Sequence, residues 1–68
     1  MKSQNELIAY YTKNLDKVIN AYGLVSDYTT HAFFLLQGAK MNIPFAYIHA
    51  WAKIKCDQLQ EEALEFTV

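Results

Sequence analysis

Three side chains in this sequence are of the types that ligate metals or act as a nucleophile and its base: His31, His49 and Cys56. A structural zinc site needs four ligands at close spacing, and the chain has neither a Cys-x-x-Cys nor a His-x-x-x-His pair. His49 and Cys56 are seven residues apart, which places them on one face of a helix but two turns from each other. We therefore predict that no metal is bound and that Cys56 is a packing residue.

The acidic side chains gather toward the C-terminal end, at Asp57, Glu61, Glu62 and Glu65. Paired carboxylates catalyse reactions when their environments push their pKa values apart, whereas these lie on the solvated polar face of an expected helix. Glycine occurs only at positions 23 and 38, so the sequence has no glycine-rich phosphate loop. These features predict a protein that is not an enzyme and that carries no cofactor.

Aromatic side chains are abundant, with five Tyr, four Phe and one Trp. Stacked aromatic rings beside cations can bind nucleotide bases. Tyr and Trp also pack in cores and interfaces, because their polar ends can stay wet. Both interpretations stay open for the candidate interaction and ligand-binding residues, which are Tyr10, Tyr11, Phe33, Phe34, Tyr47, Trp51 and Lys53.

Residues 37–51 resemble the repressor-type helix-turn-helix motif. Gly38 stands where that motif has a small residue, Asn42 stands where it usually has glycine, and the apolar core positions hold Ile43, Ile48 and Trp51. The resemblance implies a DNA-binding regulator. The face that would enter the major groove departs from the motif, because it offers few polar or basic groups: Phe45, Ala46, Tyr47 and His49.

The charge pattern weighs against nucleic acid as a partner. The formal net charge is −1, and all six basic residues are lysine. Without arginine there is no guanidinium fork for phosphates or base edges. Because non-specific affinity grows with the number of phosphates neutralised, we expect DNA binding to be absent or weak.

The sequence also carries no sign of secretion or membrane insertion. The polar stretch Lys2–Glu6 is not followed by a signal-peptide core, and no apolar run reaches the ~20 residues of a membrane span. A single cysteine fits a reducing compartment. We therefore expect a cytoplasmic protein without membrane contact.

Helix start and stop signals divide the chain into three helices. Ser3 and Glu6 match a capping box in front of a helix over Gln4–Tyr22, which Gly23 can terminate. A second and shorter helix is predicted over Asp27–Met41, capped by Ser26 or Asp27. A third is predicted over Pro44–Phe66, since proline suits the first helical position.

Apolar residues recur at helical spacing on the two longer helices. The first helix carries the stripe Leu7, Tyr11, Leu15, Val18 and Tyr22, and the third carries Ile48, Ala52, Cys56, Leu59, Ala63 and Phe66. The matched spacing predicts that these two stripes pack against each other. Acids near the end of the third helix oppose its dipole. Two interpretations stay open: a solvated charged tail, or acids offset by lysines, either Lys13 and Lys17 or a second copy's Lys53 and Lys55.

The middle of the chain has more apolar surface than one small domain can cover. Residues 32–36 are apolar around the whole helix, and residues 45–52 nearly so, which leaves Phe33, Phe34, Tyr47 and Trp51 near an uncovered patch. A chain of 68 residues without a disulfide usually needs a partner to be stable. We expect residues 1–68 to form a single all-α domain, a three-helix bundle or helical hairpin with a shorter middle helix, that assembles as a homo-oligomer.

The function that these features favour is protein interaction. Size and composition are typical of small regulators and inhibitors of the kind that phages and mobile elements encode, which act by binding rather than catalysis. The expected partner is the chain itself, as a dimer or larger assembly, or another protein. Two alternatives stay open: sequestering of a small nucleotide-like ligand at an aromatic-lined subunit interface, and the DNA-binding role of residues 37–51.

Overall fold

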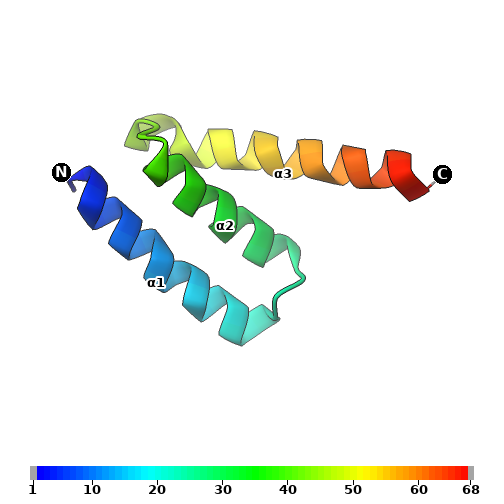
Figure 1. Cartoon of the computed structure of the whole chain (residues 1–68), viewed down its shortest axis with the longest axis horizontal. Helices are drawn as coiled ribbons and strands as arrows, with labels where there is room; N and C mark the ends of the chain where they lie inside the picture. The colour runs from blue at the N-terminus through cyan, green and yellow to red at the C-terminus, as the bar shows by residue number, and fades with distance from the viewer. Residues whose placement is uncertain (1, 68) are drawn as a thin grey trace.

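The computed structural model describes the backbone of residues 2–67 and the side chains of residues 2–63. The chain folds into three helices: α1 spans Gln4–Tyr22, α2 spans Asp27–Lys40 and α3 spans Phe45–Thr67 (Figure 1). The predicted all-α class and the shorter middle helix are confirmed. The side chains of Glu65 and Phe66, two residues of the sequence predictions, lie outside the described residues. Over the described range no helix is both long and apolar enough to cross a bilayer.

The ends of α1 lie at the predicted residues because both capping signals operate. The Ser3 hydroxyl accepts a hydrogen bond from the backbone N–H of Glu6 at 3.2 Å. At the other end Gly23 has a φ of 88°, which glycine adopts at little cost, and its N–H donates to the Ile19 carbonyl at 2.8 Å. The chain can therefore turn sharply from α1 toward α2.

Ser26 is the cap of α2, a choice that the sequence left open. Its hydroxyl accepts a hydrogen bond from the backbone N–H of Thr29 at 3.0 Å. The Thr29 hydroxyl in turn donates to the Gly23 carbonyl at 2.6 Å, and Thr29 is buried. This network joins the end of α1 to the start of α2 and satisfies the buried hydroxyl.

The turn between α2 and α3 shifts two predicted boundaries by one residue. Asn42 has a φ of 60°, a left-handed conformation that Asn tolerates better than most residues. The Ile43 N–H donates to the Gly38 carbonyl at 2.9 Å, and α2 ends at Lys40. Pro44 immediately precedes α3, and its carbonyl accepts from the Tyr47 N–H at 2.8 Å.

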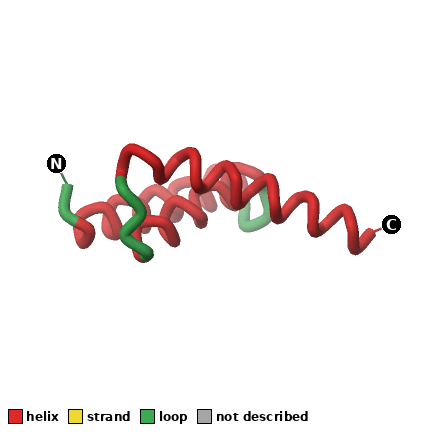
Figure 2. Tube along the Cα trace, turned by 90° about the horizontal axis from the view of Figure 1, so that it is seen from above, coloured by secondary structure: helices red, strands yellow, loops and turns green. Residues whose placement is uncertain are grey.

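Helix α2 is the central element, with α1 packed on one side and α3 on another. The antiparallel pairing of α1 and α2 is tied at both ends. The Gln4 amide donates to the carbonyls of Ala39 and Lys40, both at 3.3 Å, and Tyr22 stacks on Tyr28 with ring centroids 4.4 Å apart. The molecule is flattened, with extents of 44 × 25 × 14 Å, as Figures 1 and 2 show from two directions.

The prediction that the α1 stripe packs against the α3 stripe is wrong. Within the described residues no backbone contact joins α1 to α3. On the α1 stripe only Tyr11 is buried, while Tyr22 is exposed; on α3 Leu59 is also exposed. The reason is that residues 32–36 are apolar around the whole helix, so α2 can pack against both outer helices at once. Lys13 and Lys17 on α1 are consequently not placed beside the acids of α3.

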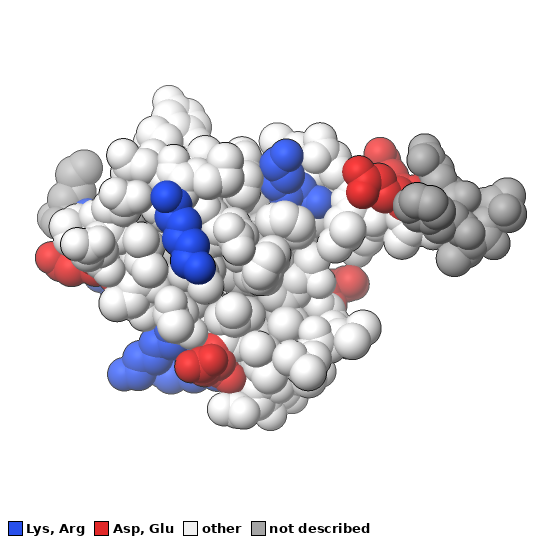
Figure 3. Space-filling view, viewed as in Figure 1, with Lys and Arg blue, Asp and Glu red and all other residues white. Residues whose placement is uncertain are grey.

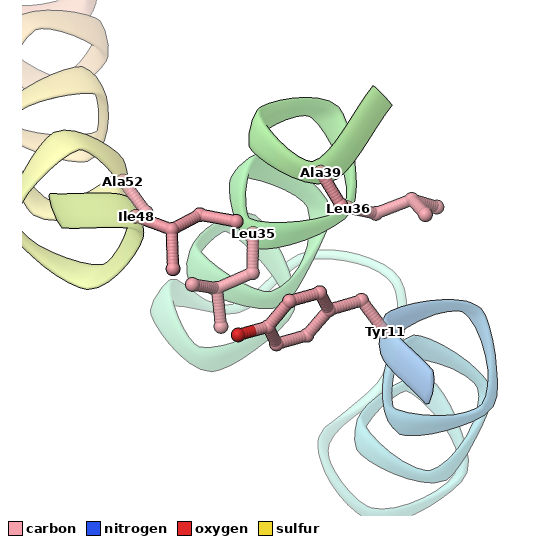
Figure 4. Close-up of a cluster of buried hydrophobic side chains, with 6 residues drawn as sticks. All are labelled: Tyr11, Leu35, Leu36, Ala39, Ile48 and Ala52. Atoms are coloured by element: carbon pink, nitrogen blue, oxygen red, sulfur yellow. The ribbon is translucent and has the colours of Figure 1, made fainter. Parts of the chain in front are cut away.

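The core is small and draws on all three helices. Its six buried side chains are Tyr11, Leu35, Leu36, Ala39, Ile48 and Ala52. Figure 4 shows Tyr11 reaching from α1 past Leu35 toward α3. Gly38 permits the close approach of α2 and α3, because a Cβ atom there would lie 2.8 Å from Ile48 Cγ1 and 3.2 Å from Trp51 Cε3.

Candidate interaction surfaces

The first candidate surface, named here the aromatic face, consists of Phe33, Phe34, Tyr47 and Trp51. The rings of Phe33 and Phe34 meet edge-on with centroids 5.5 Å apart, and those of Phe34 and Trp51 do so at 6.2 Å. Tyr47 lies one turn before Trp51 on α3, so the two side chains project from neighbouring positions. The structure therefore brings Phe33, Phe34 and Trp51 together where α2 packs on α3, with Tyr47 one turn away on α3.

The aromatic face has a packed base and exposed tips. Phe34 and Trp51 are half-buried against the core, whereas Phe33 is 44% and Tyr47 is 67% exposed. Edge-to-face aromatic pairs add about 0.5–1.5 kcal/mol beyond the area that they bury. The Lys55 ammonium lies 5.8 Å from the Trp51 ring centroid and adds a cation–π contact. These contacts brace Phe33 through Phe34 and Trp51.

The second candidate surface, named here the α1–α3 groove, lies between the two outer helices over α2. It has a volume of about 560 Å³. Tyr10 and Tyr11 line it, so these two predicted site residues belong to a different surface from the aromatic face. Its other lining residues are Lys2, Gln4, Leu7, Asn14, Leu35, Asn42, Ile43, Pro44, Phe45 and His49.

The α1–α3 groove combines aromatic walls with a few polar groups. The Lys2 ammonium lies 3.7 Å from the Tyr10 ring centroid, and the Tyr10 and Tyr11 rings meet edge-on at 5.3 Å. Burial, with a smaller contribution from Tyr10, raises the pKa of the Tyr11 phenol. Tyr11 therefore remains a neutral hydroxyl at physiological pH and presents no negative charge to the groove.

A smaller cavity of about 270 Å³ continues from the groove along α2. The two hollows share Asn14 and Leu35 in their linings, and the smaller one reaches Val18, Tyr22 and His31. The smaller cavity is lined by α1 and α2 alone, so the hollow surface extends along the side of α2 that faces α1.

His31 and His49 meet beside these hollows, although the sequence places them 18 residues apart. Their ring centroids are 6.1 Å apart, and the Tyr11 ring is 6.4 Å from that of His49. Among the described residues no three His, Cys, Asp or Glu side chains gather in a way that could hold a metal ion. Cys56 is half-buried, and burial together with Asp57 and Asp27 raises its thiol pKa. The thiol is thereby kept in its less reactive protonated form.

We expect stability to fall on mild acidification because of His31. Burial, and then the neighbouring His49, lower the pKa of His31 below its ordinary value of 6.5. As the pH falls below 6.5, the unfolded chain takes up a proton that the folded chain resists, so the free energy of unfolding decreases. Urea unfolding at several pH values between about 7.5 and about 5.5 measures how the free energy of unfolding changes with pH. The variant His31→Gln should show a smaller change. An unchanged slope in that variant would assign the pH dependence to other groups.

Residues 37–51 are the stretch whose sequence resembles the helix-turn-helix motif. Residues 37–51 form the end of α2, a turn and the start of α3, and the left-handed Asn42 occupies the position where the motif usually has glycine. Lys53 is exposed on α3 and lines neither the groove nor the smaller cavity. Figure 3 shows lysines separated by uncharged surface on the face in view. That DNA binding is absent or weak stays a prediction.

No protein-family model, curated protein or solved structure matches this chain. The basis for a proposed function is therefore the aromatic face and the α1–α3 groove. Sequence reasoning selected Tyr10 and Tyr11 but missed the groove that they line with Leu35, Phe45 and His49. The only signal was the aromatic content. The groove depends on α1 and α3 flanking α2 with no backbone contact between them among the described residues, and residue spacing does not encode that arrangement.

Proposed function

We propose that this protein is a small interaction module that associates with its own copies through the aromatic face and acts by binding rather than by catalysis. The observation that carries the proposal is the array of rings at the junction of α2 and α3. Edge-on contacts join exposed Phe33 to half-buried Phe34 and Phe34 to Trp51, and exposed Tyr47 lies one turn before Trp51 on α3. Aromatic residues anchored in this way are typical energetic centres of protein interfaces.

The accessible surface of the chain supports a partner of substantial size. It amounts to 5214 Å², about 800 Å² more than the roughly 4400 Å² expected of a compact monomer of 7.9 kDa. An interface of standard size buries about 800 Å² on each partner. The excess surface is therefore comparable to what one protein partner would cover.

A second copy is the occupant that we favour for the aromatic face. A two-fold axis covers one surface with the same surface, so a single patch satisfies both chains. The resulting homo-oligomer would fit the role of a small regulator or inhibitor. Small proteins often gain from a partner the stability that a limited core cannot supply.

Sedimentation velocity at tens of micromolar tests the proposal. We expect the wild-type protein to sediment as a dimer or larger species, and the double variant Phe33→Lys/Tyr47→Lys to sediment as a 7.9 kDa monomer. Both side chains are exposed, so the change should leave the helices intact, which circular dichroism checks. Buried lysines would have to lose their hydration at the contact, hence the expected dissociation.

Tyr10→Lys provides the matched control, because Tyr10 is similarly exposed but lines the α1–α3 groove. It should leave the size of the assembly unchanged. A monomeric wild-type protein would refute the proposed self-association. Dissociation by Tyr10→Lys alone would instead place the interface in the groove and contradict the assignment to the aromatic face.

A further inference from the structure

The α1–α3 groove has the size and lining of a small-molecule site, and the aromatic face has no part in it. Its volume of about 560 Å³ falls within the roughly 300–1,000 Å³ of typical ligand pockets. The floor includes Leu35 of the central helix, a buried and rigid position. A ligand would therefore rest on a surface that the fold itself holds in place.

Two exposed aromatic rings flank the groove from different helices. Tyr10 on α1 is 53% exposed and Phe45 at the start of α3 is 60% exposed. Tyr10 is braced from one side by the edge-on ring of Tyr11. Exposed rings on both walls of a pocket favour a flat ring between or upon them, because base–aromatic stacking contributes about 1–3 kcal/mol per base.

The charge in the groove favours a ligand with one negative group. Among the described residues Lys2 is the only lysine that lines it, and its ammonium lies over the Tyr10 ring, 3.7 Å from the centroid. A ring that stacks on that face of Tyr10 must displace the ammonium, which stays tethered beside it. None of the described residues that line the groove is a carboxylate. Asn14 and Asn42 add amide groups that can donate and accept hydrogen bonds.

We infer that the α1–α3 groove binds a planar aromatic molecule that carries a single anionic group. The ring stacks on Tyr10 and Phe45, and the Lys2 ammonium pairs with the anion. One lysine matches one phosphate or carboxylate, so the class is that of a nucleoside monophosphate rather than a polyphosphate. Leu35 and Tyr11 exclude water from the side of the ring that faces the core.

Isothermal titration calorimetry with adenosine monophosphate as the probe tests this inference on the full chain. Tyr10→Ala and Phe45→Ala should each weaken binding by about five- to a hundredfold, the range expected for one stacking contact. Ile54→Ala is the control, because Ile54 is similarly exposed, at 56%, but lies outside both the groove and the aromatic face. It should leave the dissociation constant unchanged.

The variant Lys2→Gln tests the contact with the anionic group separately from the stacking of the ring. This variant should weaken binding of adenosine monophosphate and leave binding of adenosine unchanged, because adenosine lacks the phosphate. Three results would overturn the inference: no heat of binding at millimolar probe, affinity insensitive to Tyr10 and Phe45, or equal loss for Ile54→Ala. Each is read independently of self-association, whose variants lie on the aromatic face.

Discussion

Leu35→Ala is expected to lower the free energy of unfolding by about 2–5 kcal/mol, which is comparable to the whole stability of a domain of this size. Leu35 is 4% exposed and lies in the core between the side chains of α1 and α3. Truncation removes contacts with both outer helices and leaves a cavity that the surrounding helices cannot fully close. Urea unfolding at one fixed protein concentration measures the loss, since association adds stability that depends on concentration.

Leu15→Ala is the matched control for this change. Leu15 is only half-buried on α1, at the edge of the core, so its truncation should cost clearly less than that of Leu35. Equal losses at the two positions would contradict the central place of α2. Such a result would favour the direct packing of α1 on α3 that the two sequence stripes predicted.

Ile48→Ala is expected to have a similarly large effect, about 2–5 kcal/mol, because Ile48 is 0% exposed. Its side chain fills the space beside Gly38, where the lack of a Cβ atom lets α2 and α3 approach closely. Loss of the Ile48 side chain should therefore loosen α3 from α2 specifically. The urea midpoint measures stability, and hydrogen exchange in residues 45–55 should accelerate more than in α1.

Ile54→Ala is the control on the same helix with the same change in volume. Ile54 is 56% exposed, so its truncation should shift the free energy of unfolding by well under 1 kcal/mol in the monomer. If Ile54→Ala proved as costly as Ile48→Ala, the side of α3 that packs on α2 would be assigned wrongly.

Local signals predicted the helices well because each boundary depends on a few neighbouring residues. Ser3 and Gly23 act within one turn of the residues that they cap, so α1 has the predicted bounds. At the α2–α3 turn, Pro44 is compatible with either side of the boundary. The hydrogen bond from the Tyr47 N–H to the Pro44 carbonyl places it before α3.

Helix order in space could not be predicted from the same patterns. The stripes on α1 and α3 were each read correctly as apolar, but periodicity does not say which neighbour a stripe meets. The arrangement of the helices depends on the central helix, whose buried Leu35 and Leu36 point to different sides of α2. The aromatic face was anticipated because residues 33, 34, 47 and 51 exceed what one core can cover, whereas the α1–α3 groove follows only from the placement of α2.

The central position of α2 has a consequence for how the chain acquires its structure. Each pair of packed helices is consecutive along the chain, and within residues 2–67 no backbone contact joins α1 to α3. Closing a short loop costs little entropy, and rates of folding rise as contacts become more local in sequence. The α1–α2 and α2–α3 hairpins can therefore form in either order, and the monomer should reach its native state within microseconds to milliseconds, the range of small helical proteins.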